Sequence, residues 1–235
     1  MHPSTTAPST PPDSSAPSDA SRVTARARRV ALWSGALAAV LLVLVAAEWG
    51  PLPAFDRAVA DVLHASAVRS PAVTGANRVL SDWVWDTWTM RALAAVAVGV
   101  LWWRGERRWA VRIAGVSVLA ALLQQALKAA VGRDRPQWPD PVDSAQFAAF
   151  PSGHAMTAAV TCGLLWWAAA LCGARPVVVR AVVAAGAVSV LGVGLTRLYL
   201  GVHWVSDVVG GWLLGVCVVA ATVAYGGRGV RKPGG

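Results

Sequence analysis

The chain has 235 residues, of which 56% are hydrophobic and only 14% are charged, with a formal net charge of +9. A soluble domain is about 45 to 50% apolar and about 25% charged, so this composition argues against an ordinary water-soluble enzyme. The apolar residues form long runs separated by short basic or proline-containing stretches, which is typical of an all-α polytopic membrane protein. The basic residues lie at the ends of these runs without a nucleic-acid-binding motif, so we expect no nucleic-acid partner. The three cysteines lie inside apolar runs, at spacings that fit neither a zinc site nor a disulfide framework.

Residues 1–29 begin with a stretch dominated by Ser, Thr, Pro and Ala and end with several arginines. They lack the apolar residues that folding requires, so we expect a disordered cytoplasmic tail. The apolar run from Val30 to Ala47 is long enough for a first transmembrane helix. The alternative is a cleaved signal peptide that ends near Ala47, but the apolar stretch is longer than the usual core of about 7 to 15 residues.

Residues 50–90 combine prolines and charged residues with a helical apolar pattern. The apolar positions at this spacing are Phe55, Val59, Val62 and Leu63. The pattern predicts an extracytoplasmic amphipathic segment between the first and second transmembrane helices, lying on the membrane surface with His64 in solvent. The tryptophans between Trp83 and Trp88 are typical of an interfacial belt.

Five more apolar segments complete a six-helix domain over residues 30–226. They run from Met90 to Trp103, Trp109 to Val131, His154 to Gly173, Pro176 to Leu195 and Trp204 to Tyr225. The first of these is short for a membrane span unless it begins near Trp85. Gly211 and Gly215 form a G-x-x-x-G pattern, which permits close helix packing. Residues 227–235 form a short basic cytoplasmic tail.

The placement of lysine and arginine predicts the orientation of the chain in the membrane. Twelve of the 21 basic residues fall in the alternate segments that begin with the N-terminal tail: Arg22, Arg26, Arg28, Arg29, Arg104, Arg107, Arg108, Arg175, Arg180, Arg228, Arg231 and Lys232. The loop between the third and fourth helices instead contains acidic as well as basic residues, namely Asp134, Asp140 and Asp143. We therefore expect a multi-pass protein of the cell membrane with both termini in the cytoplasm.

Cations cluster at the opposite, extracytoplasmic ends of the helices. A charge at membrane depth costs at least about 2.5 kcal/mol, and Lys128, Arg135 and Arg197 would repel one another unless an anion joined them. Guanidinium groups suit phosphate oxygens, and Ser152 and Gly153 begin a helix, where free N–H groups favour the same anion. Each residue alone is more simply a snorkelling anchor or a plain N-cap, but together they predict a phosphate-binding site.

Two histidines at this end suggest covalent catalysis. His203 and Asp207 are four residues apart, so on a helix the carboxylate orients one ring nitrogen and leaves the other as a nucleophile. His154 has no such carboxylate on its own helix. We expect His203 to attack phosphorus and form a phosphohistidine, with Asp207 fixing its tautomer, and His154 to protonate the leaving oxygen and later activate water. No metal or cofactor is required, because the cations and the helix N-terminus stabilise the transition state.

These residues form a three-part pattern. Lys128 precedes Arg135-Pro136 by seven positions, Pro151-Ser152-Gly153-His154 follows, and Arg197 is followed by His203 and Asp207. The pattern resembles the signature of the type 2 phosphatidic acid phosphatase superfamily, in its membrane lipid phosphate phosphatase branch. The third motif of that family usually opens with Ser, and here a hydroxyl is retained in Thr196. The resemblance implies phosphate binding by Lys128, Arg135, Ser152, Gly153 and Arg197, with His203 as nucleophile, His154 as acid and Asp207 as its orienting partner.

We therefore expect a membrane enzyme that hydrolyses a terminal phosphate from a lipid phosphate or diphosphate at the extracytoplasmic face. Undecaprenyl diphosphate is the first expected substrate, and phosphatidic acid and phosphatidylglycerol phosphate are the alternatives. A non-catalytic lipid-phosphate binder or flippase, and a phosphotransferase in which an acceptor alcohol resolves the phosphohistidine, stay open as other classes. The membrane spans disfavour a haloperoxidase, and the sequence does not indicate an oligomeric state.

Overall fold

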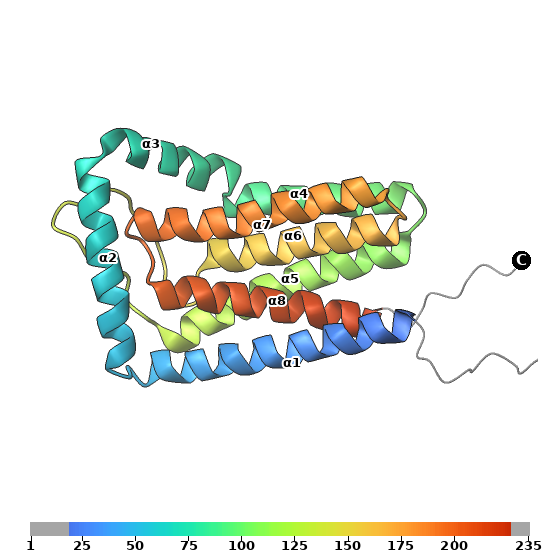
Figure 1. Cartoon of the computed structure of the whole chain (residues 1–235), viewed down its shortest axis with the longest axis horizontal. Coiled ribbons are helices and arrows are strands. Elements are labelled where there is room, and N and C mark those ends of the chain that lie inside the picture. Colours follow the sequence, from blue (N-terminus) through green and yellow to red (C-terminus); the bar gives the residue numbers. More distant parts are fainter. Residues whose placement is uncertain (1–18, 227–235) are drawn as a thin grey trace, which may run out of the picture.

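The structure, a computed structural model, describes residues 19–226. Within this range every regular element is a helix (Figure 1). The elements are α1 (Asp19–Ala46), α2 (Pro51–Arg69), α3 (Pro71–Val79), the π-helix η1 (Leu80–Val84), α4 (Thr87–Trp103), α5 (Arg107–Val131), α6 (Gly153–Leu171), α7 (Pro176–Tyr199) and α8 (Val205–Gly226). Six candidate membrane spans result, the second of which runs from α3 through α4. The predicted all-α, six-span architecture is confirmed.

The long helices run alongside one another, and α2 crosses one end of the bundle (Figure 1). The opposite end holds the start of α1, the α4–α5 and α6–α7 connections and the end of α8. The basic loops are therefore gathered at the end away from α2, as the alternation of charge predicted.

Two predicted boundaries are corrected by the structure. Helix α1 begins at Asp19, so residues 19–29, which were assigned to the tail, are helical. Alanine and arginine are good helix formers, and an adjoining span supplies the nucleus for this extension. Helix α7 continues past Leu195 to Tyr199. Residues 1–18 of the expected tail and the expected basic tail 227–235 lie outside the described residues.

The second span is interrupted near the end of the bundle that α2 covers. Helix α4 starts three residues before Met90, because Asp86 acts as its N-cap. The Asp86 carboxylate accepts a hydrogen bond from the Trp88 N–H at 2.7 Å, which satisfies a donor that has no acceptor within the helix. Trp85, at the break, packs against Gly192 of α7. The α3–α4 break is therefore a packed and capped feature.

Helix α2 is present as predicted, but the side that it buries carries two polar residues, Asp56 and His64. Asp56 is 1% exposed and His64 is 6% exposed, whereas Phe55 and Val62 are 55% and 69% exposed. The prediction that His64 is in solvent is wrong. The buried side also carries Ala60 and Ala67, and the exposed side also carries Arg57, Asp61 and Arg69, a mixed exterior that suits a helix at a membrane interface.

Buried apolar residues occur at both ends of the bundle, but the buried charged side chains lie at the end covered by α2. Away from α2, buried apolar side chains of α4, α5, α6 and α8 form a core in which Trp109 and Trp167 meet edge to face at 5.2 Å. The buried polar residues beneath and within α2 are Asp56, His64, Lys128, Ser152, Arg197, His203, Ser206 and Asp207. Because buried polar groups are costly without partners or a function, this end holds the candidate site.

Close packing of α6 against α8 fixes the start of α6. A Cβ atom at Gly211 would lie 2.7 Å from the Ser152 carbonyl oxygen, and one at Gly215 would lie 2.6 Å from Ala159 Cβ. The predicted close approach at the G-x-x-x-G pattern is confirmed. It brings the Ser152 N–H within 2.9 Å of the Asp207 carbonyl oxygen, to which it donates.

Candidate active site

The eight residues singled out from the sequence lie at the end of the bundle covered by α2. They are Lys128 at the end of α5, Arg135 on the loop before α6, Ser152, Gly153 and His154 at the start of α6, Arg197 at the end of α7, His203 on the loop before α8, and Asp207 in the first turn of α8. The charges of Lys128, Arg135 and Arg197 all act on His203. The three sequence motifs therefore converge on one site.

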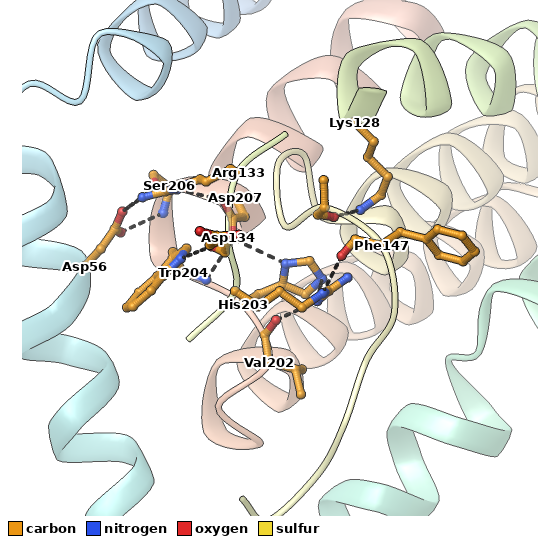
Figure 2. Close-up of polar contacts among 12 residues, drawn as sticks. Asp56, Lys128, Arg133, Asp134, Phe147, Val202, His203, Trp204, Ser206 and Asp207 are labelled. Carbon is orange, nitrogen blue, oxygen red and sulfur yellow. Dashed lines mark hydrogen bonds and ion pairs between the residues drawn. The ribbon is translucent and has the colours of Figure 1, made fainter. Parts of the chain in front are cut away.

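His203 and Asp207 form a buried pair, as predicted, but His203 precedes the helix (Figure 2). His203 Nδ1 lies 3.3 Å from Asp207 Oδ2, and the same oxygen accepts a hydrogen bond from the Trp204 N–H at 2.9 Å. Asp207 thus reaches back to the residue before α8, as an acidic residue in a helix's first turn does in a capping box. Helix capping, in addition to the four-residue spacing, sets this pair.

The other nitrogen of His203 faces a cation. Arg135 Nη1 lies 3.1 Å from His203 Nε2. Because a guanidinium only donates hydrogen bonds, this contact requires a lone pair on Nε2 and places the ring proton on Nδ1, toward Asp207. The geometry therefore selects the tautomer in which Nε2 carries the lone pair that faces Arg135.

The loop before α6 surrounds the cations with backbone carbonyl groups (Figure 2). Arg135 donates to the carbonyl oxygens of Phe147 and Gln146, each at 2.9 Å, and to that of Val202 at 2.6 Å. Lys128 Nζ donates to the carbonyl oxygen of Ala148. These bonds hold both cations toward His203 without neutralising them, so the site keeps its positive charge.

Burial sets the ionisation of the groups that lie on the loops. It lowers the pKa of His203 well below its ordinary value of 6.5, and the charges of Arg135, Arg197 and Lys128 act in the same direction. Burial and the charge of Arg197 lower the pKa of Arg135 to about 10. At neutral pH, His203 is therefore neutral and Arg135 is charged, as a nucleophile and an anion-binding group require.

Two buried polar groups of the site lack a hydrogen-bond partner. Ser152 Oγ and Arg197 Nε are both inaccessible and unpaired in the described residues, although Arg197 Nη1 donates to Ser81 Oγ at 2.9 Å. Such groups are costly unless a ligand satisfies them. A phosphate would accept hydrogen bonds from both, together with those of the free N–H groups at the start of α6.

Gly153 is closely approached by a side chain of α5. A Cβ atom at this position would lie 2.7 Å from Gln124 Nε2. Gln124 is buried and also lies 3.5 Å from the Thr157 hydroxyl group. The glycine thus allows an α5 side chain to approach the first turn of α6.

A network behind Asp207 was missed by the sequence analysis. Arg133 donates to Asp207 Oδ1 at 2.7 Å and to Asp56 Oδ2 at 2.8 Å (Figure 2). Asp56 also accepts from the Ser206 N–H at 3.0 Å. The arginine therefore links α2 to the Asp207 carboxylate. The sequence shows Asp56 on the amphipathic segment and Arg133 inside the first motif. Nothing in the sequence, however, indicates that these two residues form a pair.

His154 has a carboxylate neighbour from another helix. As predicted, α6 itself provides no carboxylate beside His154. Instead Asp86, the N-cap of α4, supplies one, with its Oδ1 atom 3.8 Å from His154 Nε2. His154 is also within the influence of Lys128, Arg135 and Arg197.

His64 joins α2 to the loop before α6. Its Nε2–H donates to Asp140 Oδ1 at 3.1 Å, and its ring stacks on Trp138 with centroids 3.9 Å apart. The hydrogen bond lowers the pKa of the Asp140 carboxyl group. Trp138 in turn donates to the carbonyl oxygen of Gly201 at 2.9 Å, so this stack braces the loops on both sides of the site.

Within residues 19–226, no group of three or more His, Cys, Asp or Glu side chains is placed to hold a metal ion. The positive charge of the site comes from the side chains described above.

Comparisons with known proteins agree with this geometry. Residues 109–230 match the PAP2 superfamily. Phosphatidylglycerophosphatase B of Bacillus subtilis (strain 168) is 39% identical over 99 residues, which cover 40% of this chain and 47% of that protein, so the match spans about half the length of that relative. The crystal structure of a transmembrane PAP2 type phosphatidylglycerolphosphate phosphatase from Bacillus subtilis has a TM-score of 0.71 at 22% identity, over 86% of this chain and 100% of the other. That similarity supports the fold. Because the family match covers more than half of the chain and contains all eight site residues, the chain belongs to the PAP2 superfamily.

Proposed function

We propose that this protein hydrolyses the terminal phosphate of a membrane lipid through a phosphohistidine on His203. One observation carries the proposal: a neutral, buried His203 is held by Asp207 through Nδ1, while Nε2 faces Arg135 among three cations. Phosphate binding alone would require only the cations. A nucleophile held in one tautomer by a carboxylate is the arrangement of covalent catalysis.

In the first step, Nε2 of His203 attacks phosphorus, and the bond from phosphorus to the leaving oxygen breaks. His154 gives its proton to that oxygen. Asp207 stabilises the positive imidazole that forms. Arg135 exchanges its contact with Nε2 for a phosphate oxygen, and Lys128 and Arg197 stabilise the charge on the equatorial oxygens.

In the second step, water attacks phosphorus and the bond from phosphorus to Nε2 breaks. His154 accepts the proton of the water, which restores its protonated form. Inorganic phosphate leaves, and His203 returns to its neutral tautomer on Asp207. The side chains supply the charge stabilisation in both steps, so we propose a metal-independent reaction without a cofactor.

A groove beside the site supports a lipid substrate. It lies between α4, α5 and α6, has a volume of about 480 Å³ and is lined mainly by alanine, valine and leucine side chains. Gln124, which contacts the start of α6 at Gly153, is part of its wall. Ala95, Val118 and Leu122 on the groove are exposed, so the groove is open toward surrounding lipid. We propose that an acyl chain lies in this groove and that its phosphate passes the start of α6 beside Gln124 to reach the cations.

We take phosphatidylglycerol phosphate as the first substrate to test, because the relative that is 39% identical bears the name phosphatidylglycerophosphatase B. Undecaprenyl diphosphate, the first expectation from the sequence, and phosphatidic acid are the comparison substrates. We also propose that the site faces the extracytoplasmic side, since the basic connections occupy the other end of the bundle.

The test is phosphate release by the detergent-purified protein in EDTA, with each of the three lipids and no added acceptor. We expect release by the wild type and none by His203→Ala. His154→Ala should release phosphate far more slowly than the wild type, because it lacks both the acid of the first step and the base of the second. A fully active His203→Ala protein would exclude the covalent mechanism. Release that requires an acceptor alcohol would indicate a phosphotransferase, and no release from any lipid would favour a binder.

A further inference from the structure

The interruption of the second span places a carboxylate beside one of the two histidines. We propose that Asp86 is a positioning residue for His154, which it orients and stabilises in the protonated form. This inference rests on the proposed role of His154 as proton donor. It gives a function to the break between α3 and α4, which hydropathy alone does not explain.

The two carboxylate oxygens of Asp86 have different tasks. Oδ2 accepts the Trp88 N–H at 2.7 Å and caps α4, which fixes the direction of the side chain. Oδ1 then lies 3.8 Å from His154 Nε2. Catalytic hydrogen bonds are commonly long before substrate binds and tighten afterwards.

The charges around His154 explain why a carboxylate is needed. The cations that act on it come from three other elements: Lys128 of α5, Arg135 of the loop before α6, and Arg197 of α7. All of these oppose a second positive charge. The nearby Asp143 lies 3.7 Å from Arg197, and Asp82 interacts electrostatically with Asp143 and Arg197. Asp86 is the carboxylate within 4 Å of His154 among the described residues.

The arrangement assigns a task to each nitrogen of His154. In the protonated ring, Nε2–H points to Asp86, and Nδ1–H is the proton that passes to the leaving oxygen as His203 bonds to phosphorus. The neutral ring then takes a proton from water at Nδ1, as the bond from phosphorus to His203 breaks. Asp86 touches neither the substrate nor the reacting atoms.

The test compares kcat/KM and kcat against pH for the wild type, Asp86→Asn, Asp86→Ser and the exposed-carboxylate control Asp61→Asn. Asn and Ser cap helices about as well as Asp, so these two variants should keep the wild-type Tm. The basic limb of both profiles should move by about one pH unit or more toward lower pH, and kcat at pH 8 should fall about tenfold or more. Asp61→Asn should match the wild type in all three measurements.

The outcomes separate this inference from the proposed function. If His154→Ala is inactive while Asp86→Asn and Asp86→Ser keep the wild-type pH profile, the inference is wrong and the proposed function stands. If Asp86→Asn loses Tm together with activity, without a shift of the basic limb, Asp86 is only a cap and the inference is again wrong. If His154→Ala is as active as the wild type, the proposed function itself fails.

Discussion

His203 lies with one ring nitrogen 3.3 Å from Asp207 and the other 3.1 Å from Arg135, and only 2% of the residue is exposed. A neutral imidazole suits this environment, because the surrounding cations and the lack of water both disfavour its protonated form. The burial that keeps this imidazole neutral therefore also makes the folded protein less stable at low pH.

This effect predicts a pH-dependent stability. Since the pKa of His203 is lowered in the folded state, the unfolded chain binds a proton below pH 6.5 that the folded chain does not. Stability should therefore fall as the pH drops below that value, by up to about 1.4 kcal/mol per pH unit from this residue. We expect Tm in detergent to fall more steeply between pH 7 and pH 5 in the wild type than in His203→Gln, which can keep both hydrogen bonds. Parallel Tm curves would contradict a lowered pKa.

The sequence predicted the residues of this site better than the contacts among them. His203, Asp207 and the three cations could be found because their spacing within each motif is local. Arg133 could not be paired with Asp56, nor His154 with Asp86, because each contact joins segments that meet only when helices distant in sequence pack. Nor could spacing show that helix capping positions both Asp86 and Asp207.

Helix α2 shows how an element can be predicted correctly and oriented wrongly. Its helical pattern was evident, but the apolar side at Phe55 and Val62 faces outward and Asp56 is buried. In a soluble protein the apolar side would form the core, whereas in a bilayer lipid can cover it. Hydropathy likewise found six spans, but it missed the helical start of α1 and the break before α4, which depend on helix propagation and capping.

The contact between α2 and the bundle predicts a large effect of Asp56→Ala. Removing one partner of a buried ion pair costs about 3 to 5 kcal/mol, and Arg133 would lose the charge that holds it beside Asp207. We expect a lower Tm and a lower kcat. Asp61→Ala, at an exposed position of the same helix, should change stability by no more than about 0.5 kcal/mol. Equal Tm values for the two variants would show that Asp56 does not anchor α2.

The contact between α6 and α8 predicts a difference between two glycines. In Gly211→Ala the new methyl group would meet backbone atoms of Ser152 and Met156 at 2.7 and 3.0 Å, and such overpacking costs about 1 to 3 kcal/mol. Because Ser152 and Asp207 lie at this contact, kcat should fall together with Tm. Gly99→Ala, which meets nothing within 4 Å, should leave both unchanged or slightly raise Tm. If both variants behave alike, this close approach does not position the site.

At the scale of the whole molecule, the bundle separates two environments along its length. The apolar core and the basic connections occupy one end, and the buried polar network under α2 occupies the other. A substrate lying in the groove between α4, α5 and α6 would place its phosphate near the polar end. The proposed chemistry would therefore take place at the end opposite the basic connections, which we propose is the extracytoplasmic one.

This arrangement makes the orientation directly testable by cysteine labelling. In a background in which Cys162, Cys172 and Cys217 are replaced by alanine, Ser144→Cys reports on the exposed loop at the site and Glu106→Cys on the exposed α4–α5 connection. We expect a membrane-impermeant maleimide to label Ser144→Cys in intact cells and Glu106→Cys only after permeabilisation, because the basic connections stay in the cytoplasm. Phosphate release by both variants in detergent confirms that they are folded. The reverse labelling pattern would place the active site in the cytoplasm, where the same chemistry would act on lipids of the inner leaflet.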